Sequence, residues 1–161
     1  TGAGFLLNNE MGDFNAGPGL TDARGLIGTP ANLAEPGKRM LSSMTPTIVA
    51  RDGDLFMVTG TPGGRTIINT VLQTILNVID HGMSAQAAVD AGRVHHQWLP
   101  DMMRHEEPGF SKDSLRGLAA MGHKMKVGGY PQGSAEVIVV NGEGLDGGLD
   151  RRVPDGGVSG Y

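Results

Sequence analysis

Two consecutive glycines, Gly63 and Gly64, stand where the backbone itself could do chemistry. They follow a β-prone run at residues 55–59 and precede residues 67–79, where apolar side chains recur with the 3.6-residue period of a helix. A turn between a strand and a helix N-terminus presents unpaired backbone N–H groups at the positive end of the helix dipole. Such a turn can bind an anion or stabilise a developing oxyanion, or it can be only a tight turn.

Two pairs of polar residues stand close enough in sequence to act together. Ser42 and Ser43 precede a proline and, taken alone, are typical of a turn or a cap. Glu10 and Asp13 lie three positions apart, and two carboxylates in such a stretch are typical of solvated loop charges. Residue type and spacing make both pairs candidates and leave their roles open.

Two adjacent histidines, His95 and His96, are followed by Asp101, which raises the question of a metal site. Adjacent side chains point in different directions in either regular structure, so they rarely share one ion. No third ligand stands at a recognisable spacing in the sequence. We therefore expect neither a metal nor a cofactor.

A hairpin and a helix must position the glycine pair. Residues 48–50 and 55–59 are short β-prone runs, and the Asp-Gly step at 52–53 is a hairpin signal. The helical pattern of residues 67–79 is expected to stop at Gly82. The glycine pair is thus expected between the second strand and the helix.

Further helices and a second hairpin are expected downstream. Serines that can act as N-caps begin helices over about 84–91 and 111–121. Residues 135–140 predict a strand, the Asn-Gly step at 141–142 a hairpin turn, and residues 144–149 a glycine-diluted partner strand. This order implies an α+β fold of two layers, with helices packed on a mostly antiparallel sheet.

The segments between these elements are polar or rich in glycine. Residues 4–7 are an exception, because their apolar run predicts a strand that enters the core. Residues 15–37 predict a long surface loop, either functional or a passive connector. Residues 126–132 predict a linker and residues 150–161 a polar tail, so we expect the chain to form a single domain.

Composition excludes several classes of function. The 161 residues suffice for one core, and the net charge of −4 gives no sign of a nucleic-acid partner. The chain has no cysteine, so disulfide and thiolate chemistry are excluded, and no apolar run is long enough to span a membrane. Because it begins at Thr1 rather than Met, we expect a processed product or a cut fragment.

Three motifs occur in an order that resembles one enzyme family. They are LSSMTPTIV at 41–49 with GTPGG at 60–64, LLNNEMGDF at 6–14, and HHQWLPD at 95–101. Together with the VSGY tail at 158–161, these strings resemble the small subunit of γ-glutamyltranspeptidases, and the resemblance covers essentially the whole chain.

The resemblance implies an N-terminal-nucleophile hydrolase with a four-layer αββα sandwich shared by two subunits. In this family a precursor cleaves itself, and the freed N-terminal Thr of the small subunit attacks a γ-glutamyl amide such as glutathione. A γ-glutamyl-enzyme ester then reacts with water or an amino-acid acceptor. The backbone N–H groups at the positions of Gly63 and Gly64 form the oxyanion hole.

The resemblance also assigns the polar pairs. Ser42 and Ser43 would hold the substrate α-carboxylate, and Glu10 and Asp13 the α-amino group, whose three donors need anionic acceptors. We expect all four to converge on one cavity beside the glycine pair. Gly12 departs from the family pattern, which usually has a second Asp there, so amine binding is expected to be weakened or reshaped. The His-His motif is expected to be structural, and the first half of the 15–37 loop a lid over the substrate pocket.

Thr1 is not expected to be the nucleophile. It leads directly into a string that resembles a segment about thirty residues further along the small subunit, so the nucleophile is expected upstream and the isolated chain is expected to be inactive. The expected partners are the large subunit of the same precursor and a γ-glutamyl substrate, in the periplasm or outside the cell. Two alternatives remain: a related acylase for a glutaryl β-lactam side chain, and a non-catalytic binding module.

Overall fold

A computed structural model describes residues 2, 4–129, 131–154 and 156–159. The chain divides into two compact units. The first unit contains residues 1–43 and 98–100, and the second contains residues 44–97 and 101–161. The prediction of a single domain stays a prediction.

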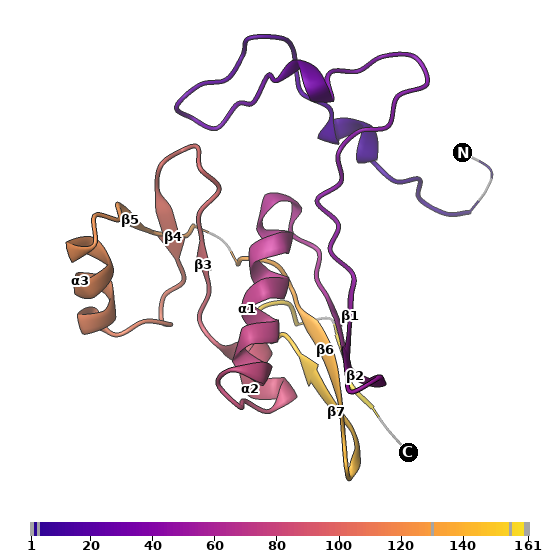
Figure 1. Cartoon of the computed structure of the whole chain (residues 1–161), viewed down its shortest axis with the longest axis vertical. Coiled ribbons are helices and arrows are strands. Elements are labelled where there is room, and N and C mark those ends of the chain that lie inside the picture. Colours follow the sequence, from indigo (N-terminus) through magenta and orange to yellow (C-terminus); the bar gives the residue numbers. More distant parts are fainter. Residues whose placement is uncertain (1, 3, 130, 155, 160–161) are drawn as a thin grey trace. The chain divides into compact units, whose positions relative to one another are not determined.

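The second unit is built on a four-stranded antiparallel sheet (Figure 1). Its first hairpin turns at Asp52 and Gly53, whose φ angles of 54° and 94° are those of the left-handed turn that an Asp-Gly step favours. The second hairpin turns after Asn141, as predicted. The strands lie in the order β1 (Thr47–Arg51), β2 (Asp54–Gly60), β6 (Glu136–Asn141) and β7 (Gly144–Leu149).

Two helices cover one face of this sheet. α1 (Ile67–Ile79) follows a 3-10 turn, η3 (Gly64–Thr66), and α2 (Ala85–Asp90) is capped by the Ser84 hydroxyl, which accepts from the Ala87 N–H at 3.3 Å. α1 was predicted from its apolar period and α2 from its capping serine. The core between helices and sheet consists of Met57, Val78, Ala85, Ala88, Val89, Ala135, Val137 and Val139.

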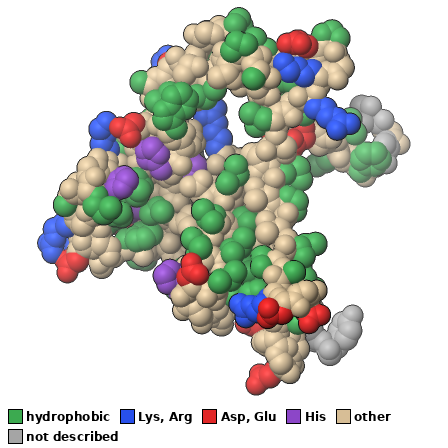
Figure 2. All heavy atoms as spheres, viewed as in Figure 1, with side chains coloured by type: hydrophobic (Ala, Val, Ile, Leu, Met, Phe, Trp, Pro, Cys, Tyr) green, Lys and Arg blue, Asp and Glu red, His purple; other side chains and the backbone are tan. Residues whose placement is uncertain are grey.

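The opposite face of the sheet is apolar and exposed. Ile48 pairs with Val58, which pairs in turn with Ile138, so three branched side chains form one row across three strands. All three are exposed, at 74%, 38% and 46%. A second exposed apolar surface runs along α1, where hydrophobic side chains gather in Figure 2; its residues are Ile68, Leu72, Leu76 and Ile79.

A small second sheet, which the sequence did not predict, completes the unit. β3 (Val94–His95) pairs antiparallel with β4 (Met103–His105), which pairs parallel with β5 (Met125–Val127). α3 (Lys112–Ala120) lies between β4 and β5 in the chain, begins at the predicted cap Ser111 and contacts β5. These strands have only two or three residues, too few for a period of two to be visible, and β5 replaces the start of the predicted linker.

The first unit is mostly irregular chain. Its regular elements, within the described residues, are two single 3-10 turns, η1 (Glu10–Asp13) and η2 (Pro30–Asn32). Residues 15–37 form the long loop that was predicted, with η2 inside it. The expected core strand at 4–7 is wrong: Phe5, Leu6 and Leu7 are 68%, 97% and 83% exposed, because within the described chain no strand pairs with this segment.

The prediction of an α+β fold is confirmed, with helices on one face of an antiparallel sheet. Within the residues that the structure describes, no helix is long and apolar enough to cross a membrane.

Candidate active site

The Gly63–Gly64 turn lies where the sequence predicted it, between β2 and the helix that begins with η3 and continues as α1. Both glycines are exposed, and both have positive φ angles, 148° and 56°. Left-handed conformations favour glycine, so the turn requires these two residues. Because the first N–H groups of a helix have no acceptor within it, the turn can donate to an anion.

A second segment packs against this turn from the side of β6. Gly133 lies so close that a Cβ there would stand 2.6 Å from the Thr61 Oγ1 and 3.0 Å from the Pro62 carbonyl oxygen. The next residue, Ser134, donates its N–H to the Thr61 Oγ1 at 2.8 Å. Two segments that are about seventy residues apart in sequence therefore share one hydrogen-bonded junction.

The 132–134 segment is held in turn by buried donors. The Gln132 carbonyl oxygen accepts from the Thr70 hydroxyl at 3.0 Å and from Arg93 Nη1 at 2.8 Å, and all three residues are buried. The Gln132 N–H donates to Glu106 Oε1 at 3.1 Å. The segment that packs against the glycine turn is therefore held by three residues: Thr70 of α1, Arg93 directly before β3 and Glu106 directly after β4.

Arg93 and Glu106 belong to a group of four charged side chains that form ion pairs, which we call the Arg93 cluster: Arg93, Glu106, Asp150 and Arg152. Arg93 Nη2 contacts Asp150 Oδ2 at 2.7 Å, with the two side chains 2% and 0% exposed. Arg152 contacts Asp150 Oδ1 at 3.0 Å and Glu106 Oε2 at 2.6 Å. The prediction of a tail is therefore wrong at its start. Asp150 and Arg152 form ion pairs with Arg93 and Glu106, which are distant in sequence.

The pKa of the Asp150 carboxyl is lowered. Burial alone raises it, but the N–H groups of Arg152 and Ala135 and the nearby guanidinium groups outweigh burial. The two N–H groups donate at 3.0 Å and 2.9 Å. Asp150 is therefore held ionised, and the cluster carries two cations and two anions that neutralise one another.

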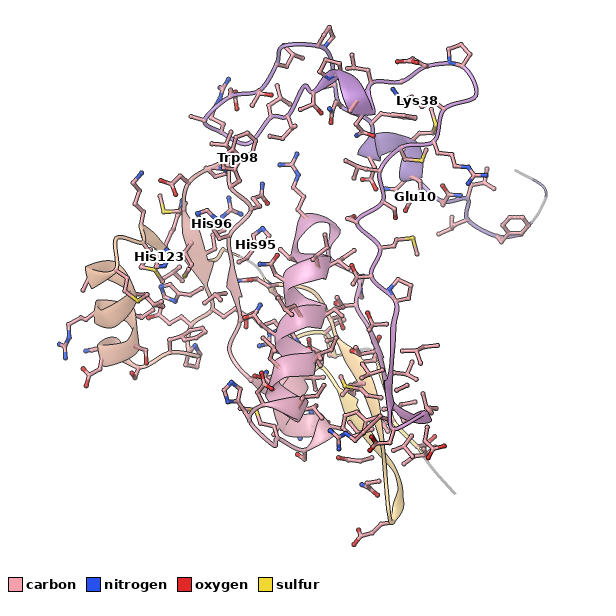
Figure 3. All side chains as sticks on the ribbon, in the orientation of Figure 1. Glu10, Lys38, His95, His96, Trp98 and His123 are labelled. Atoms are coloured by element: carbon pink, nitrogen blue, oxygen red, sulfur yellow. The ribbon has the colours of Figure 1, made fainter. Side chains whose placement is uncertain are left out.

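The first unit carries the two candidate polar pairs. Glu10 and Asp13 are the first and last residues of η1, and both side chains are half-buried (Figure 3 labels Glu10). Gly12, between them, has open space around its Cβ position. Ser42 and Ser43 lie at the end of residues 1–43 of this unit, a few residues before β1.

One buried asparagine, which sequence reasoning missed, connects the two pairs. The Asn32 side chain is 8% exposed, and its amide nitrogen donates to the Asp13 carbonyl oxygen at 2.7 Å. Its amide oxygen accepts from the Leu41 N–H at 2.9 Å, next to Ser42. Asn32 lies in a Gly- and Pro-rich loop, where no local pattern distinguishes it from a turn residue.

The structure therefore brings the predicted site residues together in part. Asn32 joins the backbone beside Ser42 to the backbone of Asp13 within one unit, whereas Gly63 and Gly64 belong to the other unit. That all six face one cavity stays a prediction. The expectation about Thr1 concerns a residue outside the described part of the chain.

The histidine pair lies at the end of β3, with His95 as the last residue of the strand and His96 directly after it (Figure 3). His95 is buried and contacts Gln97 Oε1 through Nε2 at 2.8 Å, while His96 Nε2 lies 3.3 Å from Asp101 Oδ1. The two rings have different partners. Among the described residues, no three His, Asp or Glu side chains gather as metal ligands would.

The chain is similar in sequence to known proteins. The family model for γ-glutamyltranspeptidase matches residues 1–161. The glutathione hydrolase proenzyme of Escherichia coli K12 is 49% identical over 160 residues, which are 99% of this chain and 27% of that protein. The chain therefore spans about a quarter of the length of such a relative.

Solved structures agree with the sequence comparison. A point mutant of Helicobacter pylori γ-glutamyltranspeptidase superposes with a TM-score of 0.84 at 46% identity, covering 94% of this chain and 83% of that chain. A cephalosporin acylase from Bacillus halodurans is more distant, with a TM-score of 0.71 at 27% identity, covering 81% of this chain and 25% of that one. The chain belongs to the γ-glutamyltranspeptidase family.

Proposed function

We propose that this chain supplies the oxyanion hole and the head-group pocket of an enzyme that hydrolyses or transfers γ-glutamyl groups. The observation that carries the proposal is the exposed Gly63–Gly64 turn at the N-terminus of α1, a backbone donor site in a family member. Backbone N–H groups in this setting stabilise the negative oxygen that forms when an amide carbonyl is attacked.

The proposed reaction has two halves. A hydroxyl nucleophile outside this chain attacks the γ-carbonyl carbon, and the carbonyl oxygen becomes an oxyanion that accepts from the Gly63 and Gly64 N–H groups. The C–N bond then breaks, the proton from the hydroxyl reaches the leaving amine, and a γ-glutamyl ester remains. Water or the amine of an acceptor attacks the ester and regenerates the hydroxyl.

The polar pairs of the first unit support an α-amino-acid head group. Glu10 and Asp13 are acceptors for an ammonium, and the hydroxyls of Ser42 and Ser43 are donors for an α-carboxylate. The bonds from Asn32 to the backbone of both regions support their action as one pocket. A glutaryl group lacks the ammonium, so it would leave Glu10 and Asp13 without a partner.

The exposed row of Ile48, Val58 and Ile138 supports a second layer on the open face of the sheet. Monomeric proteins rarely leave such a face uncovered. The second sheet of the αββα sandwich, to which the large subunit of the same precursor contributes, would cover this face. The relative from Escherichia coli is named a proenzyme, as this assignment requires.

The test is to express the precursor that carries this chain and to assay it with γ-glutamyl anilide and with glutaryl anilide. Turnover of the γ-glutamyl compound with little turnover of the glutaryl compound supports the proposal. Faster release from the glutaryl compound would make the protein an acylase, and turnover of neither by a processed, folded protein would favour a binding module.

The isolated 161-residue chain is the matched control, assayed beside its Thr1→Ala variant. We expect no turnover from either, because the nucleophile is expected upstream of this chain and a nucleophile must be positioned precisely to react. Robust turnover that Thr1→Ala abolishes would make Thr1 the catalytic residue and overturn the placement of the nucleophile.

A further inference from the structure

We propose that Thr61 and Thr66 are positioning residues for the two N–H groups of the Gly63–Gly64 turn, with each hydroxyl orienting one donor. The inference rests on the proposed oxyanion hole and adds to it the side chains that set its geometry. Neither threonine needs to touch the substrate.

Each N–H of the turn lies in one plane with the carbonyl that precedes it, because the peptide bond is planar. In a trans peptide the C=O and the following N–H point in opposite directions, so fixing the carbonyl also fixes the direction of the N–H. The Gly64 N–H shares its peptide plane with the Gly63 carbonyl, and the Gly63 N–H shares its plane with the Pro62 carbonyl. The two donors of the turn are therefore set by two carbonyl oxygens behind them.

The Gly63 carbonyl is held by Thr66. Its oxygen accepts from the Thr66 hydroxyl at 3.0 Å and from the Thr66 N–H at 3.2 Å. Both bonds pull this carbonyl toward the first turn of the helix. The Gly64 N–H is consequently directed away from the helix.

The Pro62 carbonyl is held by Thr61. The Thr61 hydroxyl donates to the Pro62 carbonyl oxygen at 2.7 Å. The Thr61 Oγ1 also accepts from the Ser134 N–H at 2.8 Å. The Thr61 hydroxyl is thus a donor to the turn and an acceptor from the 132–134 segment. The Gly63 N–H is oriented through a link that ends, by way of Gln132, at the Arg93 cluster.

Close packing restricts the turn at Gly63. A Cβ on Gly63 would stand 2.7 Å from Thr66 Oγ1 and 3.2 Å from the Gly133 Cα. Gly63 therefore has a hydroxyl and a backbone neighbour on this side, whereas the Cβ position of Gly64 is open. Donors that are fixed before the reaction need no reorganisation as the oxyanion forms, which is the condition for strong stabilisation.

The experiment compares Thr61→Val and Thr66→Val with Thr61→Ser and Thr66→Ser in the full-length, processed enzyme. Valine keeps the shape and removes the hydroxyl, whereas serine keeps the hydroxyl. We expect kcat/KM for a γ-glutamyl anilide to fall about tenfold in each valine variant, because a misdirected donor loses part of the factor of about 10²–10³ that a missing one costs. The serine variants should stay within about threefold of wild type.

Two readouts separate positioning from a merely structural role. A boronic-acid analogue of the γ-carboxyl forms a tetrahedral anionic adduct, so its affinity should fall in parallel with kcat/KM, while the affinity for free glutamate should not change. Thr74→Val is the matched control, because its buried hydroxyl donates at 2.9 Å to the Thr70 carbonyl inside α1 and not to the turn. It should lower the melting temperature and leave the boronate affinity unchanged.

Folded valine variants with wild-type kcat/KM and boronate affinity would overturn the inference, as would serine variants that are as impaired as valine. Equal loss of boronate and glutamate affinity would also contradict it, since that would indicate a collapsed pocket. If the wild-type enzyme itself does not turn over the γ-glutamyl anilide, the proposed function fails instead, so the two failures are distinguishable.

Discussion

The Gly63–Gly64 turn and the Glu10–Asp13 turn differ in the contacts that support them. The glycine turn rests on the 132–134 segment, which is tied to four charged side chains in the interior of the second unit. The acidic turn lies in irregular chain, and the Asn32 side chain links the backbone of Asp13 to the backbone of Leu41, next to the serine pair. Both regions are held by side-chain to backbone hydrogen bonds, but only the glycine turn is connected through them to buried ion pairs.

This difference fits the tasks that we propose for the two regions. An oxyanion hole must present its donors at a fixed distance, and small misplacements are costly, so a rigid base is an advantage. A head-group pocket must let an amino acid in and out, which irregular chain with few buried contacts permits. Variants in the two regions should therefore fail differently, in stability for one and in substrate binding for the other.

The largest effect is expected from Asp150→Asn. Arg93 would keep its buried charge without a carboxylate partner, and breaking a buried pair costs about 3–5 kcal/mol. Amide hydrogen exchange of β6 and β7 under increasing urea, in the full-length enzyme, would measure this loss. Asp113→Asn, which removes an exposed partner of Arg116, is the control and should cost less than about 1 kcal/mol.

The stability of Asp150→Asn is also expected to depend on pH differently from that of wild type. Because the folded-state pKa of Asp150 is lowered, its contribution to stability is complete above the unfolded-state value of about 4 and is lost as pH falls toward the folded-state value. Between neutral pH and about pH 3, wild type should therefore lose more stability than Asp150→Asn. Parallel curves for the two proteins would contradict the assigned charge state.

Asp13→Ala should act on binding and chemistry instead. The substrate ammonium would lose an anionic partner, so kcat/KM for γ-glutamyl transfer should fall about 10²-fold, with hydrogen exchange of the second unit unchanged. Glu35→Ala is the control, since Glu35 is an exposed acid of the same unit that pairs with Lys38. Kinetics of Asp13→Ala within twofold of wild type would remove Asp13 from the site.

Asn32→Ala tests the link between the two polar pairs. It leaves the Leu41 N–H without its acceptor, a loss of about 1–3 kcal/mol that falls on the arrangement of the pocket. We expect KM to rise about tenfold, with a smaller change in kcat. Thr21→Ala, which removes a hydroxyl that accepts from the Gly28 N–H in the same loop, should change KM little; equal effects of the two variants would indicate general loosening.

The smallest effect is expected from Gly12→Asp. The Cβ position of Gly12 is open, so the side chain fits, and a third carboxylate on η1 should lower KM for the γ-glutamyl donor by a factor of about three. Gly12→Asn is a control of the same size without the charge. A fall in KM with Asn as large as with Asp would assign the effect to shape.

Much of the second unit was predictable because its signals are local. Helix α1 was visible in its apolar period, α2 and α3 in their capping serines, and both hairpins in an Asp-Gly or Asn-Gly step. These features depend on residues a few positions apart. The short strands β3, β4 and β5 were missed because two or three residues carry no period, and pairing alone makes them strands.

Two expectations failed for the same reason. The apolar run at 4–7 was expected in the core and is exposed, and the segment predicted as a polar tail starts with the buried carboxylate of Asp150. Hydropathy describes what a segment would gain by burial. It does not say whether a partner surface or a partner charge is present.

The sequence by itself determined the family, the α+β class, the helices and hairpins, and the residue types of the candidate site, because each depends on a local string or period. Only the tertiary structure decided that Asn32 links Asp13 to Leu41, that Gly133 packs on the glycine turn, and that Arg93 meets Asp150. These contacts join residues that are far apart in the chain. Their energy depends on distance and burial, and neither quantity exists until the chain has folded.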